Sequence, residues 1–302
     1  MANMSKVLEQ IERDHNRSKR LIGLDYDDFI ELFNKLEIEH QKREEIKEAK
    51  KKRINAKGGG RKREISNLNE VLLTLYYIRH NISFQNLGIM FDLSESKAHT
   101  TFHYWSNLLD EILSPSLIEQ VESNESDYEY LKELLLEFEL LIDGSDQRRE
   151  RPTDKDEQKK YYSGYKHQHA FRNVFICFPG VKDIVAAFIG YPAPKAEINI
   201  FRENKDKFHE QQTFRGDLGF QGEDQIAVPP HKKPKKGKLT TQQKQENKEF
   251  SSQRIFVEHL IRLIKIFRIA QECFRLNARH YQRSIRIVCG LVRLRIGALV
   301  LG

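Results

Sequence analysis

The sequence predicts an all-α N-terminal region followed by a mixed α/β domain. Between residues 25 and 109 the apolar residues recur every three or four positions, which is the period of amphipathic helices. From Phe138 onward the pattern changes to short apolar runs separated by Gly and Pro, which is typical of strands joined by turns. A chain of 302 residues is long enough for two or three such units.

The first predicted helix begins at Asp25 or Asp28, because either side chain can cap it. Its apolar positions, which include Phe29 and Leu36, give way to a polar run. Residues 42–64 contain 11 Lys and Arg against 4 Glu. A solvated helix or a mobile linker explains this run as well as contact with a partner does. The run ends in three glycines and a basic triplet, which predict a flexible joint along a phosphate backbone. The triplet consists of Arg61, Lys62 and Arg63.

Residues 65–109 predict a helix-turn-helix domain. Ser66 is the candidate cap of a first helix, residues 84–91 form a second, and Ser94 caps a third after a turn at Asp92. The apolar face of the third helix packs inward and leaves the other face for the major groove of DNA. A plain three-helix bundle is the alternative. The residues expected to face outward are Lys97, His99, Thr100, His103 and Tyr104.

Two positions differ from the usual helix-turn-helix pattern. Gly88 stands where a small Ala is common, and Asp92 stands where the turn usually has Gly. Asp tolerates a left-handed backbone, although less easily than Gly does. His99 and His103 are one helical turn apart and so could bind a metal ion, but no third ligand is evident. We therefore favour DNA contact or simple exposure for this pair.

Charge is distributed unevenly along the chain. Residues 110–146 contain 12 acidic residues and one Lys, whereas residues 231–302 contain 17 Lys and Arg against 4 Glu. The stretch from Asp110 to Glu139 is predicted to be a helical connector, whose charge either keeps DNA away or is simply a solvated face. The whole chain has a formal charge of +7 and a pI near 9.1, which favours a polyanionic partner without identifying it.

The predicted order of elements after the connector is a strand, a hairpin, a helix, a strand and closing helices. This order suits a ribonuclease-H-like fold. The hairpin turns at Pro179-Gly180, and the last strand ends at Asp217. The predicted ranges are 138–142 for the first strand, 165–178 and 181–189 for the hairpin, and 195–209 for the helix.

Three carboxylates far apart in the sequence stand where they can converge on metal ions. Asp143 ends a buried strand, Asp217 ends a later strand among glycines, and Glu258 lies in a helix that is apolar on most sides. Each alone has an ordinary explanation as a turn residue or as an ion-pair partner. Arg254, Glu258 and Lys265 are spaced by four and seven residues, so they share one helix face. A carboxylate between two cations that can hold phosphate indicates phosphodiester chemistry.

Four passages resemble the DDE transposases of bacterial insertion sequences, in the group called insertion sequence family five. They are IDGSDQRRERP around Asp143, KYYSGYKHQHAFRNVFI after it, GDLGFQG around Asp217, and RIFVEHLIRLIKIFRI around Glu258. The last passage resembles the group's signature of Arg, three residues, Glu, six residues and Lys. Arg254, Glu258 and Lys265 fill that signature.

The resemblance also has departures. The group often has Tyr three positions before the Arg, where this chain has Ser251. Similar proteins often carry a His-Asp pair at the start of the middle helix, where this chain has Ala196-Glu197, and this weakens any helper role for that position. The C-terminal RLRIGALVLG is a weaker match than the body of the chain. An inactive copy is therefore an alternative.

The resemblance implies a DNA transposase that binds the terminal repeats of its element and catalyses metal-dependent DNA cleavage and strand transfer. The α/β catalytic domain would have a ribonuclease-H-like fold, in which Asp143, Asp217 and Glu258 hold two Mg²⁺ ions, with Mn²⁺ able to substitute. Arg254 and Lys265 would bind phosphate. The basic approach to the site, where simple surface solubility is an equal explanation, would consist of Arg148, Arg149, Arg151 and Lys166.

The expected partners are double-stranded DNA, both as terminal repeats and as target, and at least a second copy of the chain. Two other functions are alternatives. A helix-turn-helix DNA-binding regulator would need no metal-dependent nicking, and a ribonuclease-H-like nuclease would cut DNA without strand transfer.

The expected domains are an N-terminal helical region (1–57), the helix-turn-helix domain (58–112), the acidic connector (113–135) and the catalytic domain (136–302). The three cysteines show no CxxC spacing, so neither a disulfide framework nor a zinc site is indicated. No signal peptide is recognised, and the apolar C-terminal end is interrupted by arginines, so it is not a membrane span. A bacterial protein of the cytoplasm, associated with the nucleoid, is expected.

Overall fold

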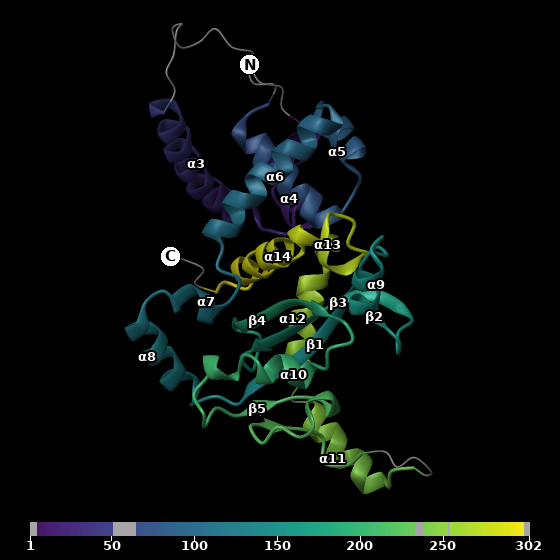
Figure 1. Cartoon of the computed structure of the whole chain (residues 1–302). Coiled ribbons are helices and arrows are strands. Elements are labelled where there is room, and N and C mark those ends of the chain that lie inside the picture. The colour runs from purple at the N-terminus through teal and green to yellow at the C-terminus, as the bar shows by residue number, and fades with distance from the viewer. Residues whose placement is uncertain (1–4, 51–64, 233–237, 253, 299–302) are drawn as a thin grey trace, which may run out of the picture. The chain divides into compact units, whose positions relative to one another are not determined.

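The chain folds into two compact units (Figure 1). The computed structural model describes residues 5–50, 65–232, 238–252 and 254–298. Unit 1 comprises Met1–Leu113 with Phe267–Ile269, and unit 2 comprises Ser114–Ile266 with Ala270–Gly302. The basic triplet predicted to lie along DNA, Arg61 to Arg63, is outside the described residues. None of the helices within the described ranges is long and apolar enough to cross a membrane.

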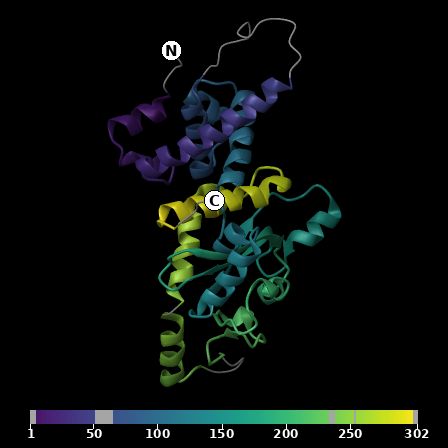
Figure 2. The same ribbon diagram turned by 90° about the vertical axis from the view of Figure 1, so that its left-hand side faces the viewer.

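Unit 1 is helical in its described part. The predicted helix after Asp25 is confirmed as a long helix, α3, which buries Phe29, Leu32 and Leu36 and contacts α4 and α6 (Figure 2). Asp25 occupies the N-cap position of α3, but its side chain makes no capping hydrogen bond. The helices are α1 (Lys6–Arg13), α2 (Arg17–Leu21), α3 (Tyr26–Ala49), α4 (Asn67–His80), α5 (Phe84–Phe91) and α6 (Glu95–Ile112).

Helices α4, α5 and α6 form the predicted helix-turn-helix. The hydroxyl groups of Ser66 and Ser94 accept hydrogen bonds from backbone N–H groups in the first turns of α4 and α6, as expected of N-caps. Asp92 has the left-handed conformation expected of the turn, with φ of 56°. Gly88 is needed where α5 meets the turn, because a Cβ there would lie 2.5 Å from the carbonyl oxygen of Leu93. Both departures from the usual pattern therefore have a structural account.

Unit 2 is built on a mixed sheet. Its main strands run in the order β4-β3-β1-β5-β6, and β2 pairs with the start of β3. The β1–β3 and β3–β4 pairs are antiparallel, whereas β1–β5 and β5–β6 are parallel. This is the ribonuclease-H-like arrangement, so the predicted fold class is confirmed. The strands are β1 (Leu140–Arg148), β2 (Tyr162–Ser163), β3 (Gln168–Cys177), β4 (Ile184–Pro192), β5 (Phe214–Arg215) and β6 (Ile226–Ala227).

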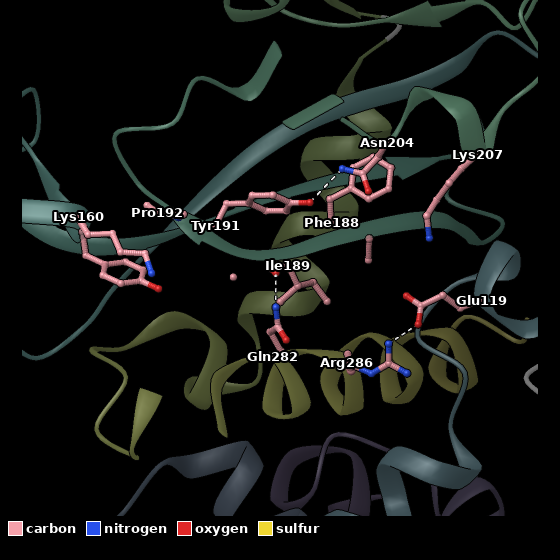
Figure 3. A pocket seen from close by; sticks show the side chains of 13 residues that line it. Glu119, Lys160, Phe188, Ile189, Tyr191, Pro192, Asn204, Lys207, Gln282 and Arg286 are labelled. Atoms are coloured by element: carbon pink, nitrogen blue, oxygen red, sulfur yellow. Dashed lines mark hydrogen bonds and ion pairs between the residues drawn. The ribbon is translucent and has the colours of Figure 1, made fainter. Parts of the chain in front are cut away.

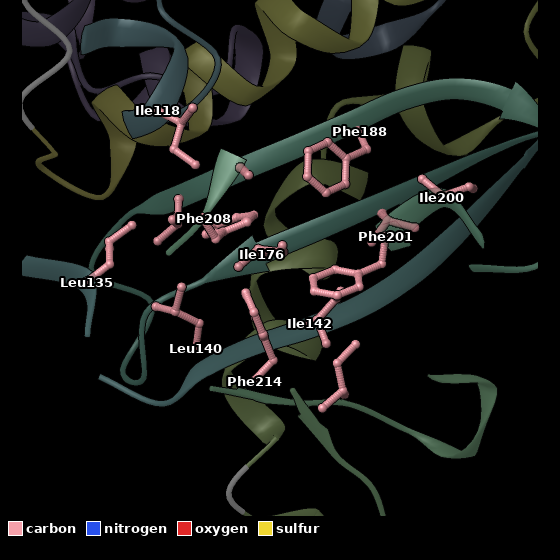
Figure 4. Packing of buried hydrophobic residues seen from close by; sticks show 14 of the residues in the cluster. Ile118, Leu135, Leu140, Ile142, Ile176, Phe188, Ile200, Phe201, Phe208 and Phe214 are labelled. Atoms are coloured by element: carbon pink, nitrogen blue, oxygen red, sulfur yellow. The ribbon is translucent and has the colours of Figure 1, made fainter. Parts of the chain in front are cut away.

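One face of the sheet carries an apolar cluster (Figure 4). Ile142 of β1, Ile176 of β3 and Phe201 of α10 belong to it, together with residues of α7 and α8. Because successive residues of a strand point to opposite faces, Asp143 faces away from this cluster, toward α12, which contacts β1 and β3. The helices are α7 (Leu117–Val121), α8 (Glu125–Leu135), α9 (Lys155–Tyr161), α10 (Glu197–Arg202), α11 (Thr241–Ser252), α12 (Ile255–Lys265), α13 (Arg268–Gln271) and α14 (Tyr281–Arg295).

The predicted hairpin is confirmed as β3 and β4, and Gly180 in its turn has φ of 85°. Two predicted bounds are wrong. The first strand does not end at Asp143 but continues to Arg148, because β3 pairs with it throughout and Gln147 is buried with its side-chain N–H donating to the Glu272 carbonyl. The helix predicted at 195–209 is the much shorter α10, followed by a 3₁₀ turn at Lys205–Lys207.

Candidate active site

Asp143 lies in the middle of β1, and its carboxylate is close to α12. Its Oδ2 is 3.5 Å from Nη2 of Arg254, and its Oδ1 accepts a hydrogen bond of 2.8 Å from the Gly144 N–H. Burial raises the pKa of Asp143 to about 6; Arg254 opposes this rise, whereas Asp217 and Glu258 add to it. The three acids singled out in the sequence therefore share one electrostatic neighbourhood.

Asp217 follows β5, which runs parallel to β1 and pairs with it at Leu140 and Leu141. This pairing brings the end of β5 beside the strand that carries Asp143. The Asp217 carboxylate caps the 3₁₀ turn Leu218–Phe220 by accepting a hydrogen bond of 2.7 Å from the Gly219 N–H. The strand that was expected to end near Asp217 is thus present, although it is only two residues long.

Glu258 lies on the exposed side of α12. The helix buries Val257, Leu260, Ile261 and Ile264, so it is amphipathic. The expectation that the helix is buried on most sides is therefore wrong. Because water reaches Glu258, its carboxylate does not depend on a buried partner for solvation.

Arg254 and Lys265 lie at opposite ends of α12, and Arg254 contacts Asp143. The Arg254 side chain is buried, and its contact with Asp143 places a positive charge beside the strand. Burial lowers the pKa of Lys265, and Lys166 lowers it further, whereas Asp143 and Asp146 raise it. Arg254 of the signature therefore meets Asp143 directly, while phosphate binding by Arg254 and Lys265 stays a prediction.

The predicted basic approach is only partly available. Arg149 stacks on the rings of Tyr161 and Phe171, at 4.4 and 4.8 Å from their centroids, so it contributes to packing. Lys166 has its Nζ 2.8 Å from Oδ2 of Asp146. Both cations thus have protein partners before any DNA is bound.

Glu197 is a fourth carboxylate in this neighbourhood, although the Ala196-Glu197 departure weakened the expectation of a helper role there. It is the first residue of α10, and its Oε1 lies 3.8 Å from Nε of Arg172. Burial raises the pKa of Glu197 to about 7; Arg172 opposes the rise, and Asp217 and Asp143 add to it. The signal that could have found it was the acid position of the family's His-Asp pair, since Glu197 keeps a carboxylate there.

The donor chemistry of the site fits a divalent metal ion. Carboxylate oxygens are the ligands that hard divalent cations take in proteins. Within the described residues, however, no group of three or more His, Cys, Asp or Glu side chains is arranged to hold a metal. Asp143 and Asp217 instead contact Arg254 and the Gly219 N–H. Metal binding would therefore exchange at least some of these contacts for contacts with the cation.

The predicted DNA-facing side of α6 is largely accessible. His99 and Thr100 are exposed, and Lys97 and His103 are half-buried. The Nε2 atoms of His99 and His103 lie 3.1 Å apart, and Lys97 Nζ is 3.4 Å from Oε1 of Glu70. The expectation for Tyr104 is wrong: it is half-buried, and its hydroxyl lies 2.7 Å from Nδ1 of His40 on α3.

A separate cavity of about 460 Å³ lies beside β4 in unit 2 (Figure 3). Its lining includes Arg286, which pairs with Glu119, and Lys207, whose Nζ is 3.5 Å from Glu122 Oε2. The Tyr191 hydroxyl accepts a hydrogen bond of 3.0 Å from the Asn204 side chain across the same cavity. The cavity does not include the carboxylates, and its cations are paired, so the carboxylate neighbourhood remains the candidate site.

A ribonuclease-H-like sheet with acids gathered from β1, the turn after β5 and α12 defines a class of nucleases that act on phosphodiester bonds. The chain belongs to the family described as DDE superfamily endonuclease, whose model matches residues 142–293, half of the chain. A second model, described as the helix-turn-helix of DDE superfamily endonuclease, matches residues 65–115. The predicted family and the helix-turn-helix are thereby confirmed, while membership of insertion sequence family five stays a prediction.

The chain is also similar to one curated protein and to two solved structures. It is 28% identical over 240 residues to the probable transposase for insertion sequence element IS702 of Microchaete diplosiphon, covering 77% of this chain and 82% of that protein. A piggyBac transposase synaptic complex with hairpin DNA matches with a TM-score of 0.41 and 12% identity, over 84% of this chain and 72% of the other. A pre-cleavage Mos1 transpososome matches with a TM-score of 0.18 and 10% identity, over 84% of each chain.

Proposed function

We propose that this chain is the DNA transposase of an insertion sequence, which cuts the ends of its element and joins them to target DNA. The observation that carries the proposal is the position of Asp143, a largely buried carboxylate whose Oδ2 lies 3.5 Å from Nη2 of Arg254. Burial raises the pKa of Asp143, and Asp217 and Glu258 add to that rise. The family of DNA-cutting endonucleases to which the chain belongs supports the proposal. So does its similarity to a protein named as a probable transposase.

Asp143, Asp217 and Glu258 are the proposed ligands of two Mg²⁺ ions, for which Mn²⁺ can substitute. When bound, such ions activate the attacking oxygen and stabilise the leaving oxygen at phosphorus. In cleavage, a water oxygen forms a bond to phosphorus while the bond to the 3′ oxygen breaks. In strand transfer, the freed 3′-hydroxyl attacks a target phosphate in the same way. Cutting and joining are thus one reaction with two nucleophiles.

The basic residues of α12 complete the proposed site. Arg254 is proposed to donate to a DNA phosphate while its Nη2 stays beside Asp143. Lys265 lies half-buried at the other end of the helix and supplies a second cation. The two cations would then hold DNA phosphates beside Glu258.

Terminal-repeat recognition is assigned to the exposed side of α6, with Lys97, His99, Thr100 and His103 as the contacting residues. The basic triplet from Arg61 to Arg63 is proposed to track the phosphate backbone. Because transposition joins two DNA ends, the chain is expected to act as a dimer or a larger assembly on DNA of the nucleoid. The DNA would be both terminal repeats and target.

The test is Mg²⁺-dependent cleavage and strand transfer of DNA that carries the ends of the encoding element, with wild type, Asp143→Ala and Asp156→Ala. Asp156 is a matched control because it is exposed at the start of α9. We expect the Asp143→Ala protein to bind the ends normally but to lose both reactions, while Asp156→Ala keeps them. Retained cleavage by Asp143→Ala would overturn the site assignment. Wild-type binding without cleavage would indicate a regulator, and cleavage without joining a nuclease.

A further inference from the structure

We infer that Glu197 is a fourth carboxylate of the divalent metal site, beside Asp143, Asp217 and Glu258. This inference rests on the proposed function, since it adds a ligand to the metal site proposed there. The inference comes from the position of the Glu197 side chain, which lies against the segment that carries Asp143 and against the turn that carries Asp217. The Glu197 carboxylate enters from α10, whereas Glu258 enters from α12.

The two oxygens of Glu197 face two glycines that flank the proposed ligands. A Cβ on Gly144, the residue after Asp143, would lie 2.1 Å from Oε1 of Glu197. A Cβ on Gly219, whose N–H binds Asp217, would lie 3.0 Å from Oε2. Any larger residue at Gly144 would collide with the carboxylate. Both glycines therefore leave room for the Glu197 carboxylate, which lies against the residue after Asp143 and against the residue whose N–H binds Asp217.

An ion pair with Arg172 is the alternative role for Glu197, but Arg172 already has its partners. Its Nε and Nη2 donate to the two carboxylate oxygens of Asp146 at 2.7 and 2.9 Å, and its Nη1 donates to the Lys195 carbonyl at 2.9 Å. The Asp146 side chain is only 3% exposed, and its hydrogen bonds from Arg172 and Lys166 hold its pKa below the usual value. Arg172 is thus neutralised without Glu197.

Glu197 itself is poorly compensated. Its side chain is 21% exposed, and its ion-pair contact with Arg172 is 3.8 Å long. Within the described residues its carboxylate accepts no hydrogen bond. Burying a carboxylate without hydrogen-bond donors is costly unless a cation binds it. A divalent ion held by Asp143 and Asp217 would supply that charge, and Glu197 would supply an oxygen ligand.

The test measures metal binding directly, without DNA and without activity. Mn²⁺ is titrated into the full chain at pH 8, and the unbound ion is followed by electron paramagnetic resonance. The variants are Glu197→Gln, Asp143→Asn and Glu203→Gln. Glu203 is a matched control because it caps the other end of α10 and pairs with Lys195. We expect Glu197→Gln to weaken Mn²⁺ binding by about tenfold or more and Glu203→Gln to leave it unchanged.

The outcomes separate this inference from the proposed function. Mn²⁺ binding that is weakened by Asp143→Asn but not by Glu197→Gln overturns the role of Glu197 alone. Binding that neither variant changes overturns the proposed metal site itself. A second variant, Glu197→Asp, keeps a carboxylate on a shorter side chain and is expected to bind Mn²⁺ with intermediate affinity. If it binds no better than Glu197→Gln, while circular dichroism shows both folded, the carboxylate is not the group that matters.

Discussion

Nη2 of Arg254 lies 3.5 Å from Oδ2 of Asp143, and both side chains are largely shielded from water, at 10% and 17% exposed. The pair joins the residue just before α12 to the middle of β1. Arg254 thereby reduces the cost of an ionised carboxylate that burial would otherwise keep protonated. Arg254 thus favours the ionised form of Asp143, although the two residues are more than a hundred positions apart in the chain.

Removing this cation is expected to shift the pH dependence of the reaction. Asp143 must be ionised to hold a divalent cation, and it becomes protonated below its pKa of about 6. Because Arg254 lowers that pKa, Arg254→Met raises it, and the acid limb of the cleavage-rate profile moves to higher pH. Profiles from pH 5 to pH 9 check this. The control is Arg262→Met, because Arg262 is an exposed arginine on the same helix. If the acid limb of the cleavage-rate profile falls at the same pH in both variants, the prediction is contradicted.

Substitutions on α6 are expected to separate phosphate contact from base recognition. Lys97→Ala should weaken binding to all DNA about equally and reduce the slope of log affinity against log salt by about one. His99→Ala should instead lose about 1–3 kcal/mol of discrimination between element ends and unrelated DNA. Fluorescence anisotropy over a salt series measures both. Lys35→Ala is the control, because Lys35 lies on α3 and pairs with Glu31; an equal effect there would argue against α6 as the recognition helix.

Gly88→Ala is expected to destabilise the helix-turn-helix. The added Cβ would lie 2.5 Å from the Leu93 carbonyl oxygen, and the Leu93 N–H donates to the Gly88 carbonyl at 2.8 Å, so neither backbone can move freely. The clash should lower the free energy of unfolding by about 1–3 kcal/mol, although Ala ordinarily favours a helix. Urea denaturation measures it. Gly164→Ala, where a Cβ meets nothing within 4 Å, should leave stability nearly unchanged.

Arg293→Met is expected to destabilise unit 2. Arg293 is fully buried, and its Nε and Nη2 donate to the two carboxylate oxygens of Asp183 at 2.6 and 2.8 Å. It also donates to the carbonyls of Ser114 and Ser116. Losing the cation leaves a buried carboxylate without its partner, which costs about 3–5 kcal/mol.

The double variant Arg293→Met with Asp183→Asn tests the cause of that loss. Because Asn carries no charge, the double variant should unfold at a higher urea concentration than Arg293→Met alone. If the second substitution lowers stability further, the loss comes from packing and not from an unpaired charge.

The helix-turn-helix could be predicted closely because its signals are local. Ser66 and Ser94 cap their helices through hydrogen bonds within the first turn, and Asp92 adopts the turn conformation by itself. The acids of the site were also predictable as candidates, since strand ends and helix spacing are visible along the chain. Their surroundings were less predictable. The end of β1 was missed because pairing with β3, and not apolar content, sets how far that strand extends.

The sequence by itself determined the family, the helix-turn-helix and the α/β order of this protein, because caps, turns and hydrophobic periods act over a few residues. Only the tertiary structure decided which charges meet. It placed Arg254 on Asp143, left Glu258 on the exposed side of α12 and brought Glu197 between Gly144 and Gly219. These relations depend on which strands and helices pack together, and the electrostatic cost of a charge depends on that packing and not on its neighbours in the chain.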